Sequence, residues 1–129
     1  MSMSKEASQE FCVFEYLYRD AGNWKTHGVL LMEGDCEGML SALQSCLEWN
    51  NQFVAEQVGV PPLQKQHFIE CREGPSDLDH AFHEFSALRA ATGKEVAEMP
   101  VCGSLGDFIA RMHKAAGHWD VRLSPYCDY

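Results

Sequence analysis

The feature that most constrains the fold is a run of aromatic and β-branched residues at positions 11–18, Phe-Cys-Val-Phe-Glu-Tyr-Leu-Tyr. Residues of these types favour a β-strand. Apart from Glu15, both faces of this strand would be apolar, which is typical of a strand near the centre of a sheet. Residues 28–33 form a second strand-like run, ended by Gly34. The two runs together predict neighbouring strands in the N-terminal part of the chain.

The connection between these runs carries more polar chemistry than a hairpin requires. Two to five turn-forming residues would suffice, whereas residues 19–28 include Arg19, Asp20, Asn23, Trp24 and Lys25. Loops held by a rigid sheet are common binding sites. The arginine can pair with a carboxylate or phosphate, and the tryptophan can stack on a flat ligand. Turn formation, local ion pairing and a tryptophan that covers the sheet edge explain the same residues without a ligand.

Further elements follow along the chain. Residues 35–49 are expected to form an amphipathic helix with Asp35 as its N-cap. Residues 53–58 are compatible with helix or strand, and the Gly-Val-Pro-Pro sequence at 59–62 ends whichever element precedes it. Residues 66–71 are predicted to form a strand.

Two capping boxes of the form Ser-x-x-Asp begin at Ser76 and Ser104. The first predicts a helix that ends near Gly93, although residues 80–85 also fit a strand. The second predicts a helix that ends at Gly117. The alternating pattern that follows, up to residue 123, predicts a closing strand.

The order of these predicted strands and helices indicates a single α+β domain over residues 11–129, preceded by a flexible tail at 1–10. The expected architecture is a mainly antiparallel sheet with about three helices packed on one face. An antiparallel sheet can leave its other face toward water. That open face, lined partly by the first strand, would be available to a partner or to a second copy of the chain.

Composition narrows the functional classes. The net charge of −9, from 19 acidic and 10 basic residues, argues against general nucleic-acid binding, which requires clustered cations. The acidic residues fit a solvated face or a surface that docks on a basic partner. No apolar run approaches the roughly 20 residues that span a bilayer. The six cysteines are scattered and the N-terminus lacks an export signal, so reduced thiols and a cytoplasmic protein are expected.

A helix over residues 77–91 would place His80, His83 and Glu84 on one side, where they could bind zinc, iron or manganese. Asp79 could then orient one histidine. The order H-x-x-H-E differs from the two arrangements typical of metalloproteases. Histidines with a structural or surface role are the alternative.

Two other constellations are weaker. His67, Cys71, His80 and His83 have zinc-ligand chemistry, but their spacing matches no zinc-finger pattern. Cys71 or Cys102 could pair with a histidine as a nucleophile, but no motif selects the pair.

Three patterns together resemble a small uncharacterised bacterial protein family. They are Tyr-x-Tyr-Arg-Asp-Ala-x-Asn-x-Lys-x-x-Gly at 16–28, Phe-x-x-Glu-Gln-Val-Gly-x-Pro-x-Leu at 53–63, and His83-Glu84. The family has no established activity, cofactor or partner, so the resemblance carries over no functional residue. It implies that the three segments share one fold and one site. The candidate binding residues are therefore Arg19, Asp20, Asn23, Trp24, Lys25, Glu56 and Gln57.

Two functional hypotheses follow. The preferred one is a non-enzymatic binding module without a cofactor, which uses loop 19–28 and an open sheet face to bind a protein partner or itself. The alternative is a small metal-assisted hydrolase with His80, His83 and Glu84 as ligands, in which Arg19 holds an anionic substrate and the metal lowers the pKa of bound water.

Overall fold

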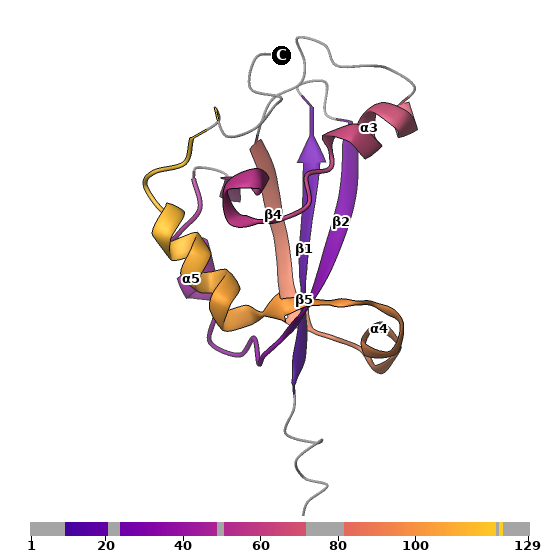
Figure 1. Cartoon of the computed structure of the whole chain (residues 1–129), viewed down its shortest axis with the longest axis vertical. Helices are drawn as coiled ribbons and strands as arrows, with labels where there is room; N and C mark the ends of the chain where they lie inside the picture. The colour runs from indigo at the N-terminus through magenta and orange to yellow at the C-terminus, as the bar shows by residue number, and fades with distance from the viewer. Residues whose placement is uncertain (1–9, 21–23, 49–50, 72–81, 121, 123–129) are drawn as a thin grey trace, which may run out of the picture.

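The computed structural model describes residues 10–20, 24–48, 51–71, 82–120 and 122. These residues form a five-stranded sheet and four α-helices, and Figure 1 shows their arrangement. In chain order the elements are β1 (Phe11–Arg19), β2 (Lys25–Glu33), α2 (Leu40–Gln44), β3 (Gln52–Val54), the 3₁₀ turn η2 (Ala55–Val58), α3 (Gln64–Cys71), β4 (Phe82–Ala90), α4 (Gly93–Glu98), β5 (Val101–Ser104) and α5 (Leu105–Ala115).

The predicted central strand is confirmed. The strand order is β3-β4-β1-β2-β5, so β1 lies between β2 and β4 and pairs antiparallel with both (Figure 1). Only β5 runs parallel to its neighbour, β2, which makes the sheet mixed. The α+β class with a mainly antiparallel sheet is therefore correct.

One face of the sheet carries the hydrophobic core. Alternate residues of β1, namely Cys12, Phe14, Tyr16 and Tyr18, are buried there. The Phe14 ring lies 4.8 Å from the ring of Phe108 on α5, centroid to centroid. Helix α5 begins at Ser104, whose side chain accepts a hydrogen bond from the Asp107 backbone N–H, as the capping box predicts. Its buried residues recur at helical spacing, so α5 covers this face as an amphipathic helix.

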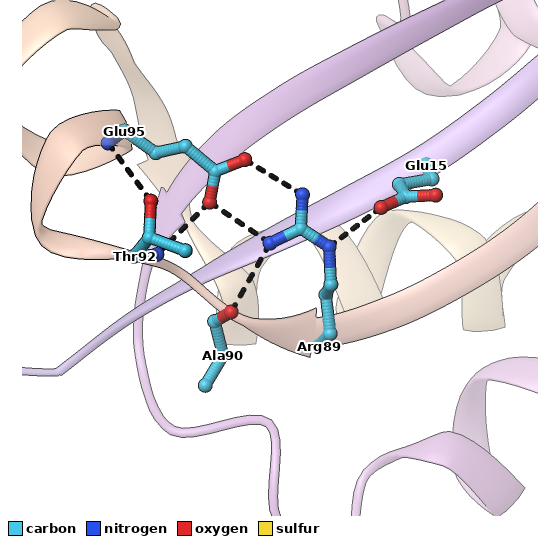
Figure 2. A network of polar contacts seen from close by, with 5 residues as sticks. All are labelled: Glu15, Arg89, Ala90, Thr92 and Glu95. Atoms are coloured by element: carbon cyan, nitrogen blue, oxygen red, sulfur yellow. Dashed lines mark hydrogen bonds and ion pairs between the residues drawn. The ribbon is translucent and has the colours of Figure 1, made fainter.

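The opposite face is buried at its centre and exposed toward the β5 edge. Val13 and Leu31 are buried, whereas Val29 and Val101 are each 46% exposed. The expected open face is therefore exposed toward β5, and along β1 it is buried only at Val13 and Leu17. Arg89 on this face bonds Glu15 through Nε (2.5 Å) and Glu95 on α4 through both Nη atoms (2.8 and 2.6 Å), as Figure 2 shows. This network ties α4 to the second face, so the helices do not all pack on one side.

Several elements differ from the prediction. Residues 66–71 belong to helix α3 rather than to a strand. The helix preferred for the segment up to Gly93 is not formed over residues 82–90; the alternative, a strand, is confirmed there as β4, which pairs with both β1 and β3. The helix expected over 35–49 is reduced to α2, because Gly38 adopts a left-handed φ of 77° and Asp35 instead accepts a bond from the Glu37 backbone N–H.

The C-terminal part of the sheet also differs from the prediction. Strand β5 and helix α4 were not anticipated, and α4 begins at Thr92 with a capping box completed by Glu95. Residues 118–120 form no strand, so the predicted closing strand is wrong there. Residues 53–58, which were compatible with helix or strand, form the end of strand β3 followed by η2. The tail at 1–9, Ser76 and Asp79 lie outside the described residues.

Candidate functional site

The hairpin between β1 and β2 is tighter than the sequence suggested. Arg19 pairs with Lys25 in the antiparallel register, so the connection comprises only residues 20–24. Arg19 and Lys25 therefore belong to the strands. Five-residue loops are among the common hairpin connections. Asn23, one of the candidate residues, lies outside the described part of the chain.

Asp20 closes this hairpin at its base. Its backbone N–H donates to the Trp24 carbonyl (3.1 Å), and its Oδ1 accepts from the Trp24 backbone N–H (3.1 Å). Its second carboxylate oxygen lies 3.0 Å from Nε2 of His67 on α3. One side chain thus fixes the turn and attaches it to a helix 47 residues further along the chain.

His67 is the buried centre of this polar cluster, at 1% exposure. Its Nδ1 lies 2.8 Å from the Thr26 hydroxyl on β2. Because an ionised carboxylate only accepts, Nε2 carries the hydrogen toward Asp20. In the neutral ring, Nδ1 then accepts from the Thr26 hydroxyl. The chain Thr26–His67–Asp20 has the residue types of a hydrolase triad, but Thr26 is only 2% exposed. A substrate could not reach the hydroxyl, so the cluster serves to hold the hairpin.

Arg19 is engaged by Glu84 on the neighbouring strand β4. Its Nε and Nη2 donate to the two carboxylate oxygens at 2.9 and 3.2 Å. This two-pronged hydrogen bond raises the pKa of Arg19 above its ordinary value. The pair is part-buried, so the guanidinium is oriented by its neighbour in the sheet. This partner of Arg19 is therefore neither Asp20 nor a neighbouring loop, as the ligand-free interpretation expected, but a residue of strand β4 that lies 65 positions further along the chain.

The proposed metal ligands do not share a helix face. His83 and Glu84 are successive residues of β4, so their side chains point to opposite faces of the sheet. The Nε2 atom of His83 accepts a hydrogen bond from the Leu63 backbone N–H at 2.9 Å. His80 lies outside the described residues. Within the part of the chain that the structure describes, no group of three metal-ligating side chains is present.

The two described histidines of the weaker zinc constellation both pack against the Tyr18 ring, and each already has hydrogen-bond partners. His67 is engaged by Asp20 and Thr26, and His83 by Leu63. Among the described cysteines, Cys102 is an exposed free thiol, while Cys12 and Cys46 are buried free thiols. Burial raises the pKa of Cys12 to about 11, with smaller contributions from Cys36 and Asp35. A raised pKa makes a thiol a poor nucleophile at neutral pH.

The other two candidate residues, Glu56 and Gln57, lie on η2. Gln57 donates through Nε2 to the His118 carbonyl (3.0 Å) and accepts through Oε1 from the Asp120 backbone N–H (2.8 Å). It therefore holds the segment that follows α5. Gln57 also lines a hollow of about 330 Å³ together with Arg111, Lys114 and Ala115. Arg111 and Lys114 were not among the predicted site residues, although their i, i+3 spacing on the polar side of α5 is visible in the sequence.

The structure thus brings Arg19, Asp20, Trp24 and Lys25 into one hairpin and gives Gln57 a different setting. Trp24 is 68% exposed, directly beside the residue that clamps the turn. No family model, curated protein or solved structure matches this chain. None of the helices among the described residues is long and apolar enough to cross a membrane.

Proposed function

We propose that this protein is a non-enzymatic binding module that docks a protein partner, or a second copy of itself, through the β1–β2 hairpin. The observation that carries the proposal is the exposure of Trp24 at a turn that Asp20 holds closed. Tryptophan is enriched among the residues that dominate binding energy at interfaces. A clamped backbone reduces the conformational entropy lost when the side chain becomes buried.

A second exposed apolar side chain, on α3, supports the same docking site. Ile69 on α3 is 70% exposed, and α3 is joined to the hairpin through the Asp20–His67 contact. Burying roughly 150 Å² of tryptophan surface contributes about 3–4 kcal/mol to association. Trp24 alone could therefore account for an affinity difference of more than a hundredfold.

The metal-assisted alternative has no comparable support. It depended on a helix over residues 77–91, and β4 instead directs His83 and Glu84 to opposite sides of the sheet. The buried Thr26–His67–Asp20 cluster is used to hold the turn. A cytoplasmic location is part of the proposal, and it agrees with the free thiols of Cys12, Cys36, Cys46 and Cys102.

Site-specific photo-crosslinking in cells tests this proposal. A photoreactive phenylalanine analogue replaces Trp24 in one variant and Val96 in a matched control, because Val96 is also an exposed apolar residue but lies on α4. We expect position 24 to crosslink to one specific protein or to a second copy, and position 96 to give only background. Sedimentation of wild type and Trp24→Ala over a range of concentrations separates self-association from a distinct partner. A monomeric protein with the same background crosslinks at both positions would refute the proposal.

A further inference from the structure

The hollow beside α5 has a charge opposite to that of the whole molecule. The described residues that line it are Gln57, Arg111, Lys114 and Ala115. Two of the four are cations and none is a carboxylate, in a chain whose net charge is −9. A small pocket lined by two cations is suited to an anionic ligand.

Arg111 is held in place from two sides. Its Nε donates to the Val58 carbonyl at 2.9 Å, and its Cζ lies 5.7 Å from the centre of the Phe108 ring. Its Nη atoms have no hydrogen-bond partner among the described residues. A guanidinium fixed in this way can present its free N–H groups to an oxyanion with little further loss of side-chain entropy.

Lys114 supplies the second charge, one helical turn further along α5. It forms no hydrogen bond or ion pair with a described residue. Basic residues near a helix C-terminus also complement the helix dipole, which offers an explanation without a ligand. The dipole places about half a negative charge at the C-terminal end of the helix. This is less than the two positive charges of Arg111 and Lys114. It also does not explain why Arg111 is held at the Val58 carbonyl on η2.

The remaining walls are preformed. Both polar ends of the Gln57 amide are bonded, to the His118 carbonyl and to the Asp120 backbone N–H. The amide thereby fixes the segment after α5. Because both of its ends are already bonded, an anion in the hollow would be bound by Arg111 and Lys114. A volume of about 330 Å³ lies at the lower end of the range for small-molecule sites.

We propose that this hollow binds a compact oxyanion that carries two negative charges, of the phosphate or dicarboxylate type. Arg111 holds one pair of oxygens through its Nη atoms, and Lys114 neutralises the second charge. This site is separate from the Trp24 hairpin, and its occupancy goes beyond the proposed docking function.

Titration of the full chain, followed by the backbone amide signals in NMR, tests the proposal. Inorganic phosphate and succinate are added separately at low ionic strength, and sodium chloride at matched ionic strength is the blank. We expect saturable shifts on residues 55–58 and 111–115. Saturation with one anion and not the other identifies the type, and saturation with both supports the shared chemistry.

Two substitutions in the hollow and one control substitution outside it make the test decisive. Lys114→Gln should weaken binding about tenfold, because it removes one charge-assisted contact from a side chain that makes no described bond. Lys94→Gln on α4 is the matched control and should leave the affinity unchanged. Arg111→Gln should abolish saturation, with circular dichroism to check that the loss of the Val58 bond has not unfolded the protein. Absence of saturation in wild type, or equal affinity in wild type and Lys114→Gln, would overturn the proposal.

Discussion

The Asp20 clamp gives the most direct test of how the hairpin is held. Asp20→Ala removes the acceptor for the Trp24 backbone N–H and the partner of the His67 Nε2–H. The first loss affects an exposed turn and should cost about 1 kcal/mol, a typical net value for one hydrogen bond. The second leaves a buried imidazole N–H without this partner, which costs about 2 kcal/mol. We therefore expect the free energy of unfolding to fall by about 3 kcal/mol.

Urea unfolding of Asp20→Ala and of two controls measures this loss. Asp35→Ala is the matched control, because Asp35 also accepts a backbone N–H bond, from Glu37, but in an exposed loop without a buried partner. It should lose about 1 kcal/mol or less. Asp20→Asn retains one acceptor oxygen and should fall between the two. If Asp20→Ala and Asp35→Ala were destabilised equally, the buried contact with His67 would contribute nothing and the reasoning would fail.

Two further predictions concern the rest of the fold. Gly28→Ala should lower the free energy of unfolding by about 2 kcal/mol, because its Cβ would lie 2.9 Å from the Tyr16 ring, whose hydroxyl is anchored on the Pro61 carbonyl at 2.7 Å. Gly93→Ala, where a Cβ meets nothing within 4 Å, is its control in the same urea assay and should be neutral or slightly stabilising. The Arg89 side chain, with help from Thr92, lowers the pKa of Glu95 to about 2. Because this folded-state pKa lies below the unfolded value, Glu95 stabilises the protein above about pH 5, and the contribution disappears as the pH falls toward 2. The stability difference between wild type and Glu95→Gln should therefore shrink over that interval, and a difference that stays constant with pH would contradict the assignment.

Elements with an unambiguous local pattern could be predicted from the sequence. β1 has a dense aromatic and β-branched run, and α5 has both the Ser-x-x-Asp capping pattern, with Ser104 as its N-cap, and a regular apolar stripe. α3 was mistaken for a strand because two of its buried residues, Gln64 and His67, are polar and hide the helical period. In β4 the apolar residues Phe82, Phe85 and Leu88 recur every third position and imitate a helix. Pairing with two neighbouring strands overrides that pattern.

The candidate site was predictable only where its residues are close in sequence. Arg19, Asp20 and Trp24 stood out because they crowd one short connection. The link from Asp20 to His67 spans 47 residues, and no local rule connects the two positions. Arg111 and Lys114 look like an ordinary solvated helix face until η2 packs beside them.

The position of β1 has a consequence for synthesis of the chain. Its partner β2 follows after a five-residue turn, so this hairpin can form within about 10 μs of leaving the ribosome. Its other partner, β4, arrives about 70 residues later, which at 5–20 residues per second takes about 4–14 s. Once β2 has paired, β1, the most apolar of the described strands, keeps one unpaired edge until β4 has emerged. The nascent hairpin should therefore be the segment most exposed to misassociation and to capture by chaperones until β4 has emerged.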